Sequence, residues 1–348
     1  MGGNIKFQGK TTRRISSEEY EDMNFDLVEY LSRVTGVPTE WIIPIPFYEQ
    51  KESFGDIDII INSDKLDPHW KINLGMAFEI ISNSNCHSIC YNGVQVDLIM
   101  TAQKYFWSSI SYFAYNDISN ITGRIFHKLG LKHGHKGLSI VIRDIDNTKI
   151  LKEIELETDG DEVIRIAYEI LGLDRYIRIE GIQTLEDIFK LVASSKYFDP
   201  EIFSLEHRSG TSRVRDAKRK TYHEFLQWIA TTKPEAKYSF ADKSELGGHG
   251  IRHPYYHDII LKYWPWVEQE VNDLIESDAK HKRFIKYFNG ELVQELTGLS
   301  GKELGKFMEY MRPIVKSDGF RKTVLDKAEE DRLSFVIKFV EFMWGTYV

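Results

Sequence analysis

The sequence predicts an α+β fold in which a small mixed β-sheet with flanking helices precedes a mostly α-helical body. Three observations support this class. Short apolar runs rich in isoleucine and valine occur within the first hundred residues and are typical of buried strands. An Asn-Gly pair separates two of these runs, as in a β-hairpin. From Pro200 onward, helical patterns and helix-start signals predominate.

The overall composition limits the classes of protein. At 348 residues the chain is long enough for two or three domains, and its 42% hydrophobic and 28% charged residues are typical of a globular protein. No apolar run is long enough to cross a bilayer and no signal peptide is recognised, so we expect a cytoplasmic protein without membrane contact. The two cysteines, Cys86 and Cys90, are expected to be free thiols.

The N-terminal segment is expected to form an arm, a helix and an edge strand. Residues 1–15 are interpreted as a polar arm that carries several basic side chains. Ser16 and Glu19 form the pattern of a capping box, which predicts a helix that ends at Gly36. Residues 41–48 contain two prolines and are expected to be extended, as an edge strand or a rigid loop.

The next strand presents two carboxylates. It begins with Gly55-Asp56-Ile57-Asp58 and continues as an isoleucine run to residue 61. Because side chains alternate between the faces of a strand, Asp56 and Asp58 should project to the same side while Ile57 points into the core. Two neighbouring carboxylates repel each other, and a divalent cation between them relieves that repulsion.

A third carboxylate follows in a hairpin. The pair Asn92-Gly93 favours a type I′ turn between two short strands, and the second of these strands contains Asp97 as its single charged residue. The turn fixes the register of the hairpin, so the fold can bring Asp97 to Asp56 and Asp58. Three carboxylates on neighbouring strands predict a site for Mg²⁺ or Mn²⁺ that supports phosphoryl transfer. The alternative is that Asp-x-Asp marks a solvated strand edge.

The middle of the chain is less informative about chemistry. Residues 101–130 carry many aromatic side chains at helical spacing, and we expect these to pack in the core. A charge-rich, turn-prone segment at 144–161 is interpreted as a domain boundary. It is followed by a helix at 162–171, a short strand at 176–180 and a helix at 184–194 that begins with a capping Thr184.

The densest basic segment of the chain is the run Arg208–Lys220. A net charge of −8 argues against general electrostatic binding of nucleic acid, so a nucleic-acid surface has to be a local patch. Two interpretations of the run stay open. It is either the solvated face of a helix or the contact region for phosphate or RNA. Helical spacing would place Arg215 and Arg219 on one side of that helix, next to Lys218.

The last third of the chain predicts further helices. Residues 291–297 form one of them, which Gly298 ends, and Ser300 with Glu303 has the pattern of a capping box for the next.

The sequence Gly55-Asp56-Ile57-Asp58 before an apolar strand, with Asp97 on a later strand, resembles the nucleotidyltransferase superfamily of DNA polymerase β-like enzymes. The segment 298–307 is similar to a turn-helix segment of tRNA nucleotidyltransferases and poly(A) polymerases. The arrangement of the whole chain also resembles uncharacterised nucleotidyltransferases of large bacteriophages and giant viruses, for which the setting would be the host cytoplasm.

The resemblance implies a domain organisation. Residues 16–145 would form the nucleotidyltransferase (palm) domain, 146–200 a linking α/β segment and 201–348 an α-helical C-terminal domain. The implied activity is Mg²⁺-dependent transfer of a nucleoside monophosphate from an NTP, ATP included, to a hydroxyl acceptor. An RNA or tRNA 3′ end is the first choice of acceptor.

The resemblance also implies roles for individual residues. Asp56 and Asp58 would hold both metal ions, and Asp97 would complete the ion that activates the attacking hydroxyl. Ser53 and Gly55 would shape the phosphate loop. The remaining candidates for contact to the nucleotide lie in the basic run, namely Arg213, Arg215 and Lys218.

One feature departs from the family pattern. The family usually has a Gly-Ser pair at the end of the preceding strand, where it contacts the triphosphate. The corresponding region of this chain, residues 43–50, has no such pair, and Ser53 would stand in for the serine. Two alternatives therefore stand beside the RNA-modifying enzyme. The protein would be an inactive nucleic-acid-binding or scaffolding protein with the same fold, or a nucleotidyltransferase that modifies a small molecule or a protein.

Overall fold

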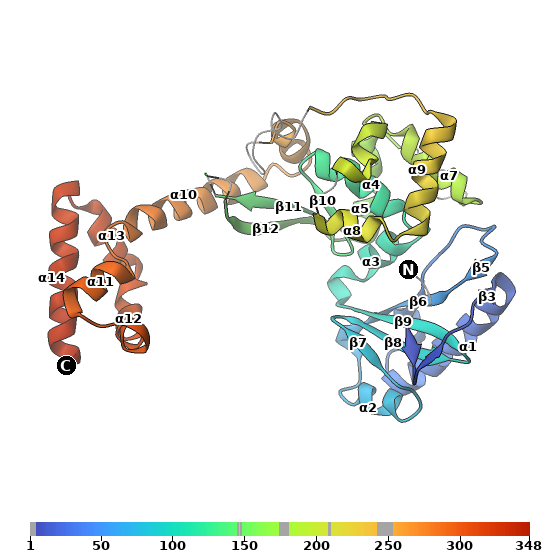
Figure 1. Ribbon diagram of the computed structural model, residues 1–348, viewed down its shortest axis with the longest axis horizontal. Coiled ribbons are helices and arrows are strands. Elements are labelled where there is room, and N and C mark those ends of the chain that lie inside the picture. The colour runs from blue at the N-terminus through green and yellow to red at the C-terminus, as the bar shows by residue number, and fades with distance from the viewer. Residues whose placement is uncertain (1–4, 145, 147, 174–180, 208–209, 242–252) are drawn as a thin grey trace. The chain divides into compact units, whose positions relative to one another are not determined.

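The computed structural model describes residues 5–144, 146, 148–173, 181–207, 210–241 and 253–348. It confirms the predicted fold class, because a small mixed sheet with helices is followed by a mostly helical C-terminal body (Figure 1). Contacts divide the chain into two compact units. Unit 1 contains Met1–Ile142 and Lys152–Trp264, and unit 2 contains Arg143–Leu151 and Pro265–Val348. The division does not follow the boundaries expected at 145 and 200, since the segment 152–264 packs within unit 1.

The main sheet of unit 1 has five strands in the order β4-β6-β9-β8-β7. Strand β6 pairs in parallel with β9, and the other neighbouring strands pair antiparallel. Edge strand β4 confirms the extended, proline-containing segment predicted near residues 41–48. The bounds of these strands are β4 (Ile42–Pro44), β6 (Asp56–Asn62), β7 (Ile81–Asn83), β8 (Cys86–Tyr91) and β9 (Val94–Thr101).

The hairpin between β8 and β9 has the predicted turn. Asn92 has φ of 48° and Gly93 has φ of 79°, which are the left-handed values that a type I′ turn requires at both central residues. The turn aligns Ser88 of β8 with Asp97 of β9. This register determines which side chains surround Asp97.

Each face of the sheet packs on a different set of helices. Helices α1 (Ser17–Thr35) and α2 (Trp70–Gly75) cover the face that carries Ile57 and Leu98. Helix α3 (Phe106–Phe113) covers part of the other face through Phe106, which packs with residues of the same face as the aspartates.

Helix α1 begins and ends as predicted. Ser16 accepts a hydrogen bond from the backbone N–H of Glu19, and the Glu19 carboxylate accepts one from the Ser16 N–H. Gly36 ends the helix in the left-handed conformation.

The expected N-terminal arm is folded into strands from residue 6. Strands β1 (Lys6–Phe7) and β2 (Lys10–Thr11) form a hairpin, and β3 (Ile15–Ser16) pairs with β5 (Ser53–Phe54). Phe7 and Ile15 are buried within a largely polar sequence. Two buried anchors are enough to hold this segment, and they were not apparent among the surrounding basic residues.

A second sheet occupies the region expected to be a boundary. Its strands are β10 (Lys132–Gly134), β11 (Gly137–Arg143) and β12 (Ile150–Glu157), in that order. The charged segment 144–161 therefore contains a strand, because Ile154 and Leu156 alternate with charged residues and are buried. The strand expected at 176–180 lies outside the described residues.

Helix α4 of unit 1 packs against strand β10, and α5, α7, α8 and α9 lie near α4 on the same side of this sheet (Figure 1). The predicted capping Thr184 is confirmed, since it forms a capping box with Asp187 at the start of α7. The bounds are α4 (Ile118–Lys128), α5 (Gly160–Leu171), α7 (Leu185–Ser194), α8 (Gly210–Asp216), α9 (Lys220–Thr232) and a π-helix at Tyr256–Leu261.

Unit 2 consists of helices around their own apolar core, together with the tip of the β11–β12 hairpin. Within this unit, Lys282 of α10 donates to Asp144 at 2.9 Å. Gly298 ends a helix as predicted, but Ser300 begins the next one without a capping hydrogen bond. The helices are α10 (Val267–Ile285), α11 (Gly290–Thr297), α12 (Gly301–Val315), α13 (Asp318–Asp326) and α14 (Glu329–Tyr347).

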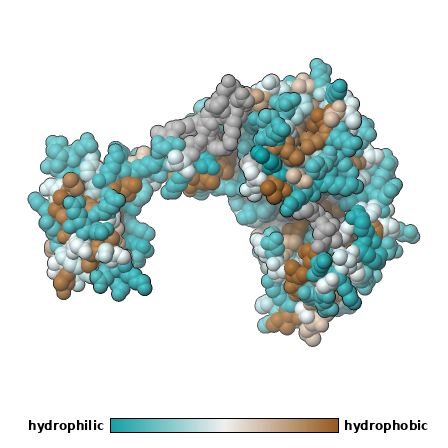
Figure 2. Space-filling view, in the orientation of Figure 1, coloured by the Kyte–Doolittle hydropathy of each residue, from teal (hydrophilic) through white to brown (hydrophobic). Residues whose placement is uncertain are grey.

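The surface in view carries apolar residues interspersed with polar ones (Figure 2). Exposed apolar side chains include Phe25, Met76 and Phe342. Among the described helices, none combines the length and the apolar character needed to span a membrane.

Candidate metal centre

The parallel pair β6–β9 places the three aspartates together. Asp58 and Asp97 are direct partners in this pair, and Asp56 lies two residues before Asp58 on the same face of β6. Farther along the strands, this face carries Ile60 and Ile99, which pack on Phe106. The carboxylates therefore occupy the end of a sheet face whose other end is filled by core residues.

The carboxylates converge as predicted. Each of Asp56, Asp58 and Asp97 offers one oxygen, and these oxygens lie within 4.8 Å of one another. Among the described residues, no other group of three or more His, Cys, Asp or Glu side chains converges in this way. Mg²⁺ takes oxygen ligands at about 2.0–2.1 Å, so small rotations of these side chains bring the oxygens within reach of one ion. An all-oxygen donor set fits Mg²⁺ or Mn²⁺.

The electrostatics of the cluster favour a bound cation. Burial, together with the charges of Asp56 and Asp97, raises the pKa of Asp58 to about 7. Burial and the charge of Asp97 also raise the pKa of Asp56, although Lys51 and Arg14 act in the opposite direction. Without a cation, burial and mutual repulsion make the ionised carboxylates cost free energy in the folded chain. A divalent ion at this point would offset that cost.

Asp97 has a fixed orientation. The Ser88 hydroxyl donates to Asp97 Oδ1 at 2.5 Å, and Gln95 Nε2 donates to both carboxylate oxygens at 3.0 Å. Gln95 is itself held, because its Oε1 accepts the backbone N–H of Ile5 at 3.1 Å. Hydrogen-bond donors such as Ser88 and Gln95 orient metal-binding carboxylates and tune the affinity of the site for the ion.

The residues expected in the phosphate loop lie directly before β6. Ser53 is exposed in β5, and Gly55 is buried between β5 and β6. The guanidinium of Arg14 donates from Nε to Ser53 Oγ at 2.9 Å and from Nη2 to the Ser53 carbonyl at 3.0 Å. A role for Ser53 and Gly55 in binding a nucleotide stays a prediction.

The basic run does not form the single helix that its spacing predicts. Helix α8 ends at Asp216 and α9 begins at Lys220, so Lys218 and Arg219 lie in the turn between the two helices. The expected grouping of Arg215, Arg219 and Lys218 on one helix side is therefore wrong. Arg208 and Ser209 lie outside the described residues.

Two arginines of the run make contacts within unit 1. Arg215 donates to Asn120 Oδ1 at 3.0 Å and to Asp216 at 3.1 Å, and Arg219 forms an ion pair with Asp117. These contacts attach the run to the beginning of α4. The side chains of Arg213, Arg215 and Lys218 are exposed, whereas that of Arg219 is partly buried.

Sequence reasoning missed several residues near the cluster. Gln95 had a visible signal, because it is two residues before Asp97 on the same face of an apolar strand. Ser88 could be found from the hairpin register alone. Lys51 lies in the loop before β5, but its contact with Asn116 joins residues far apart in the sequence and no local pattern predicts it.

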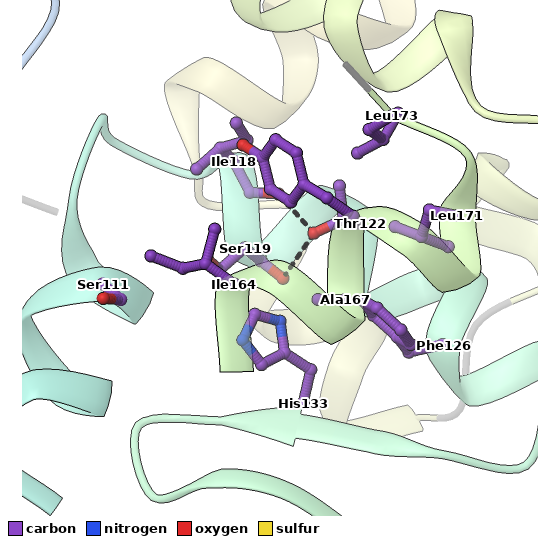
Figure 3. Close-up of a pocket in the computed structure, with 11 residues that line it drawn as sticks. Ser111, Ile118, Ser119, Thr122, Phe126, His133, Ile164, Ala167, Leu171 and Leu173 are labelled. Carbon is purple, nitrogen blue, oxygen red and sulfur yellow. Dashed lines mark hydrogen bonds between the residues drawn. The ribbon is translucent and has the colours of Figure 1, made fainter. Parts of the chain in front are cut away.

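A separate cavity lies among α4, α5 and β10 (Figure 3). Its mainly apolar wall includes Phe126, His133 and Leu171, and the Thr122 hydroxyl on this wall donates to the Ile118 carbonyl at 2.9 Å. The volume in which the centre of a water molecule fits is about 20 Å³. The cavity therefore has room for roughly one water molecule and not for a nucleotide. None of its lining residues comes from β6 or β9.

The chain was also compared with known proteins. Neither a protein-family model nor a curated protein sequence matches it. The feature of this chain that points to a function is therefore the geometry of the Asp56–Asp58–Asp97 cluster.

Proposed function

We propose that the protein is a nucleotidyltransferase that depends on a divalent metal. One observation carries the proposal: three carboxylates from two adjacent parallel strands offer oxygens within 4.8 Å of one another, and burial and mutual repulsion raise the pKa of two of them. A cluster of this kind on a rigid sheet suits phosphoryl transfer, for which catalysis depends on positioning and charge stabilisation.

In the proposed reaction, the oxygen of an acceptor hydroxyl attacks the α-phosphorus of an NTP. The bond from this phosphorus to the bridging oxygen breaks, pyrophosphate leaves and the hydroxyl proton is released to solvent. Bound Mg²⁺ or Mn²⁺ would lower the pKa of the hydroxyl and neutralise charge on the leaving pyrophosphate. Asp56 and Asp58 would hold both ions. Asp97, kept in place by Ser88 and Gln95, would complete the site beside the hydroxyl.

The proposed acceptor is the 3′ end of an RNA, with tRNA included. Support comes from the exposed cations Arg213, Lys218 and Lys220 in a chain of net charge −8, because a polynucleotide needs a local basic surface. The proposed location is the cytoplasm, where NTPs and RNA are available. A small molecule or a protein would be the acceptor if this basic surface binds no RNA.

A second candidate is a nucleic-acid-binding protein without turnover. The residues after β4 favour it, since Ile45 is buried and Pro46 has no N–H to donate to a phosphate. A Gly-Ser pair at this point would offer backbone and hydroxyl donors to the triphosphate.

Labelled NTPs, Mg²⁺ and total RNA distinguish the two candidates. The enzyme predicts label in RNA that is lost in Asp58→Asn and kept in Asp26→Asn, a matched change at an exposed aspartate of α1. RNA binding by wild-type protein with no incorporation from any NTP would support the second candidate.

A further inference from the structure

Lys51 lies close enough to the aspartate cluster for the charges of Asp56 and Asp58 to act on it. Its side chain is half-buried, and Nζ lies 3.3 Å from Asn116 Oδ1 and 4.3 Å from the centre of the Phe54 ring. Within the described part of the chain, Lys51 forms no ion pair. A half-buried ammonium of this kind has N–H donors left for an anion.

Both neighbours of Lys51 are held in place. The Phe54 ring stacks on buried Tyr20, with ring centres 4.0 Å apart. Tyr115 and Asn116 have φ of 57° and 60°, and the Tyr115 N–H donates to the Pro46 carbonyl at 2.8 Å. Left-handed backbone is unfavourable for a bulky residue such as tyrosine. Here it directs the chain so that the side chain of Asn116 contacts Lys51.

The loop that carries Lys51 is also attached to a distant segment. The backbone N–H groups of Glu49 and Gln50 donate to the carbonyls of Ile182 and Gln183 at 3.0 and 2.8 Å. The ammonium is therefore presented from a loop with fixed geometry, as a preorganised binding group requires.

A second cation is close to the first. Arg14 donates to Ser53 from Nε and Nη2, and the structure gives no acceptor for its Nη1 among the described residues. Burial is the largest cause that lowers the pKa of Lys51, and the positive charge of Arg14 lowers this pKa further. The same charge of Arg14 lowers the pKa of Asp56. Two like charges that repel each other beside a metal site are typical of a place where an anion binds.

The charges of the cluster can be balanced with a substrate. Three carboxylates with two divalent ions sum to about +1, and Lys51 with Arg14 raise this to about +3. A triphosphate carries a charge of about −4 near neutral pH, so the two cations would bring the occupied site close to neutrality.

We propose that Lys51 and Arg14 form an anion subsite for the β- and γ-phosphates of a nucleoside triphosphate whose α-phosphate lies at the Asp56–Asp58–Asp97 cluster. The identity of the nucleotide rests on the proposed function, whereas the subsite itself requires only a polyphosphate. Asn116 and Phe54 are positioning residues for Lys51. In this arrangement Lys51 and Arg14 take the place of the Gly-Ser donors of the nucleotidyltransferase pattern, which this chain lacks. They also stabilise the leaving pyrophosphate.

Inorganic tripolyphosphate tests the subsite without a transfer reaction. Its affinity for the full-length protein is measured by calorimetry in saturating Mn²⁺, and Mn²⁺ affinity is measured separately by electron paramagnetic resonance. Lys51→Met is expected to weaken tripolyphosphate binding at least tenfold and to leave Mn²⁺ binding within about threefold. Lys71→Met is the matched control, because Lys71 also lies over an aromatic ring, 5.4 Å from the centre of Trp70 on α2.

Arg14→Gln is a second variant that tests the subsite even if Lys51→Met does not fold. The Arg14 side chain is exposed, so this change is expected to leave the fold intact. It should weaken tripolyphosphate binding severalfold. Tripolyphosphate affinity within twofold of wild type in both variants, or no binding to wild type in Mn²⁺, would overturn the subsite. If tripolyphosphate binding depends on Lys51 but no NTP is ever incorporated, the subsite stands and the proposed transfer function fails.

Discussion

Asp58 and Asp97 are direct partners across the parallel strands β6 and β9, and their carboxylates contribute to one cluster with oxygens within 4.8 Å. Two carboxylates on directly opposite residues of neighbouring strands repel each other unless a cation lies between them. The sheet holds them there because buried isoleucines on the opposite face of β6 fix the strand in the core. Stability of the fold and charge of the site are therefore coupled.

The first prediction concerns the pH dependence of stability without metal. The pKa of Asp58 is about 7 in the folded chain, above its value of about 3.9 when unfolded. The folded state then binds the proton more tightly, so the contribution of Asp58 is fully present below about pH 4 and is lost as pH rises through about 7. In EDTA, Asp58→Asn should gain stability relative to wild type over this window, by at most about 1.4 kcal/mol for each pH unit.

Chemical denaturation in EDTA at several pH values measures this difference. Asp26→Asn, at an exposed aspartate of α1, is the control for the loss of one carboxylate. A difference between Asp58→Asn and wild type that stays flat from pH 4 to pH 8 would refute the assigned electrostatics.

The second prediction concerns the orientation of Asp97. Ser88→Ala removes the 2.5 Å hydrogen bond to Asp97 and should weaken Mn²⁺ binding by about tenfold, as is typical for outer-shell partners of a metal. Ser82→Ala is a matched control, because the Ser82 hydroxyl contacts His87 at 2.8 Å in the neighbouring strand pair. Equal Mn²⁺ affinity in the two variants, measured by paramagnetic resonance, would mean that Ser88 has no role in the site.

The third prediction divides the basic run. Lys218→Ala with Lys220→Ala removes two exposed cations, and each lost contact to single-stranded RNA should flatten the log–log salt dependence by about 0.7. Stability should change by at most about 0.5 kcal/mol. Arg219→Ala should act differently, because it leaves the partly buried Asp117 without its ion-pair partner and should destabilise the fold by about 1–2 kcal/mol. RNA affinity that is unchanged in the double lysine variant would exclude the run as an RNA contact.

The fourth prediction tests the β10–β11–β12 sheet. Gly137 has φ of 100°, and a Cβ there would lie 2.1 Å from the Glu157 carbonyl oxygen. Gly137→Ala should therefore lower the free energy of unfolding by about 2–4 kcal/mol. Gly134→Ala lies in the same hairpin and would meet no atom within 4 Å, so its effect should be much smaller. Similar thermal unfolding of the two variants would contradict the packing of this sheet.

The sequence allowed good prediction where a local rule decides the structure. Alternation along a strand placed Asp56 and Asp58 on one face, and the Asn92-Gly93 turn fixed the register of Asp97. Prediction was poor where a few long-range contacts outweigh local composition. Strand β12 is rich in charge but is held by buried Ile154 and Leu156, and the N-terminal strands are held by a buried Phe7.

The candidate site shows the same division. Carboxylates on neighbouring strands can be found from spacing alone, but the contact of Lys51 with Asn116 depends on how α4 meets the loop before β5. The basic run appeared as one helix because its composition is uniform. The structure breaks it at the turn where Arg219 reaches Asp117, a contact between residues about a hundred positions apart.

The most direct test of the account is a crystal structure with Mn²⁺ and a non-hydrolysable NTP analogue, with anomalous scattering used to locate the metal. We predict a Mn²⁺ peak within about 2.3 Å of oxygens from Asp56, Asp58 and Asp97, with the α-phosphate of the analogue bound to the same ion. An empty cluster at saturating Mn²⁺, or a nucleotide bound elsewhere on the chain, would contradict the proposal that this cluster is a nucleotidyl-transfer site.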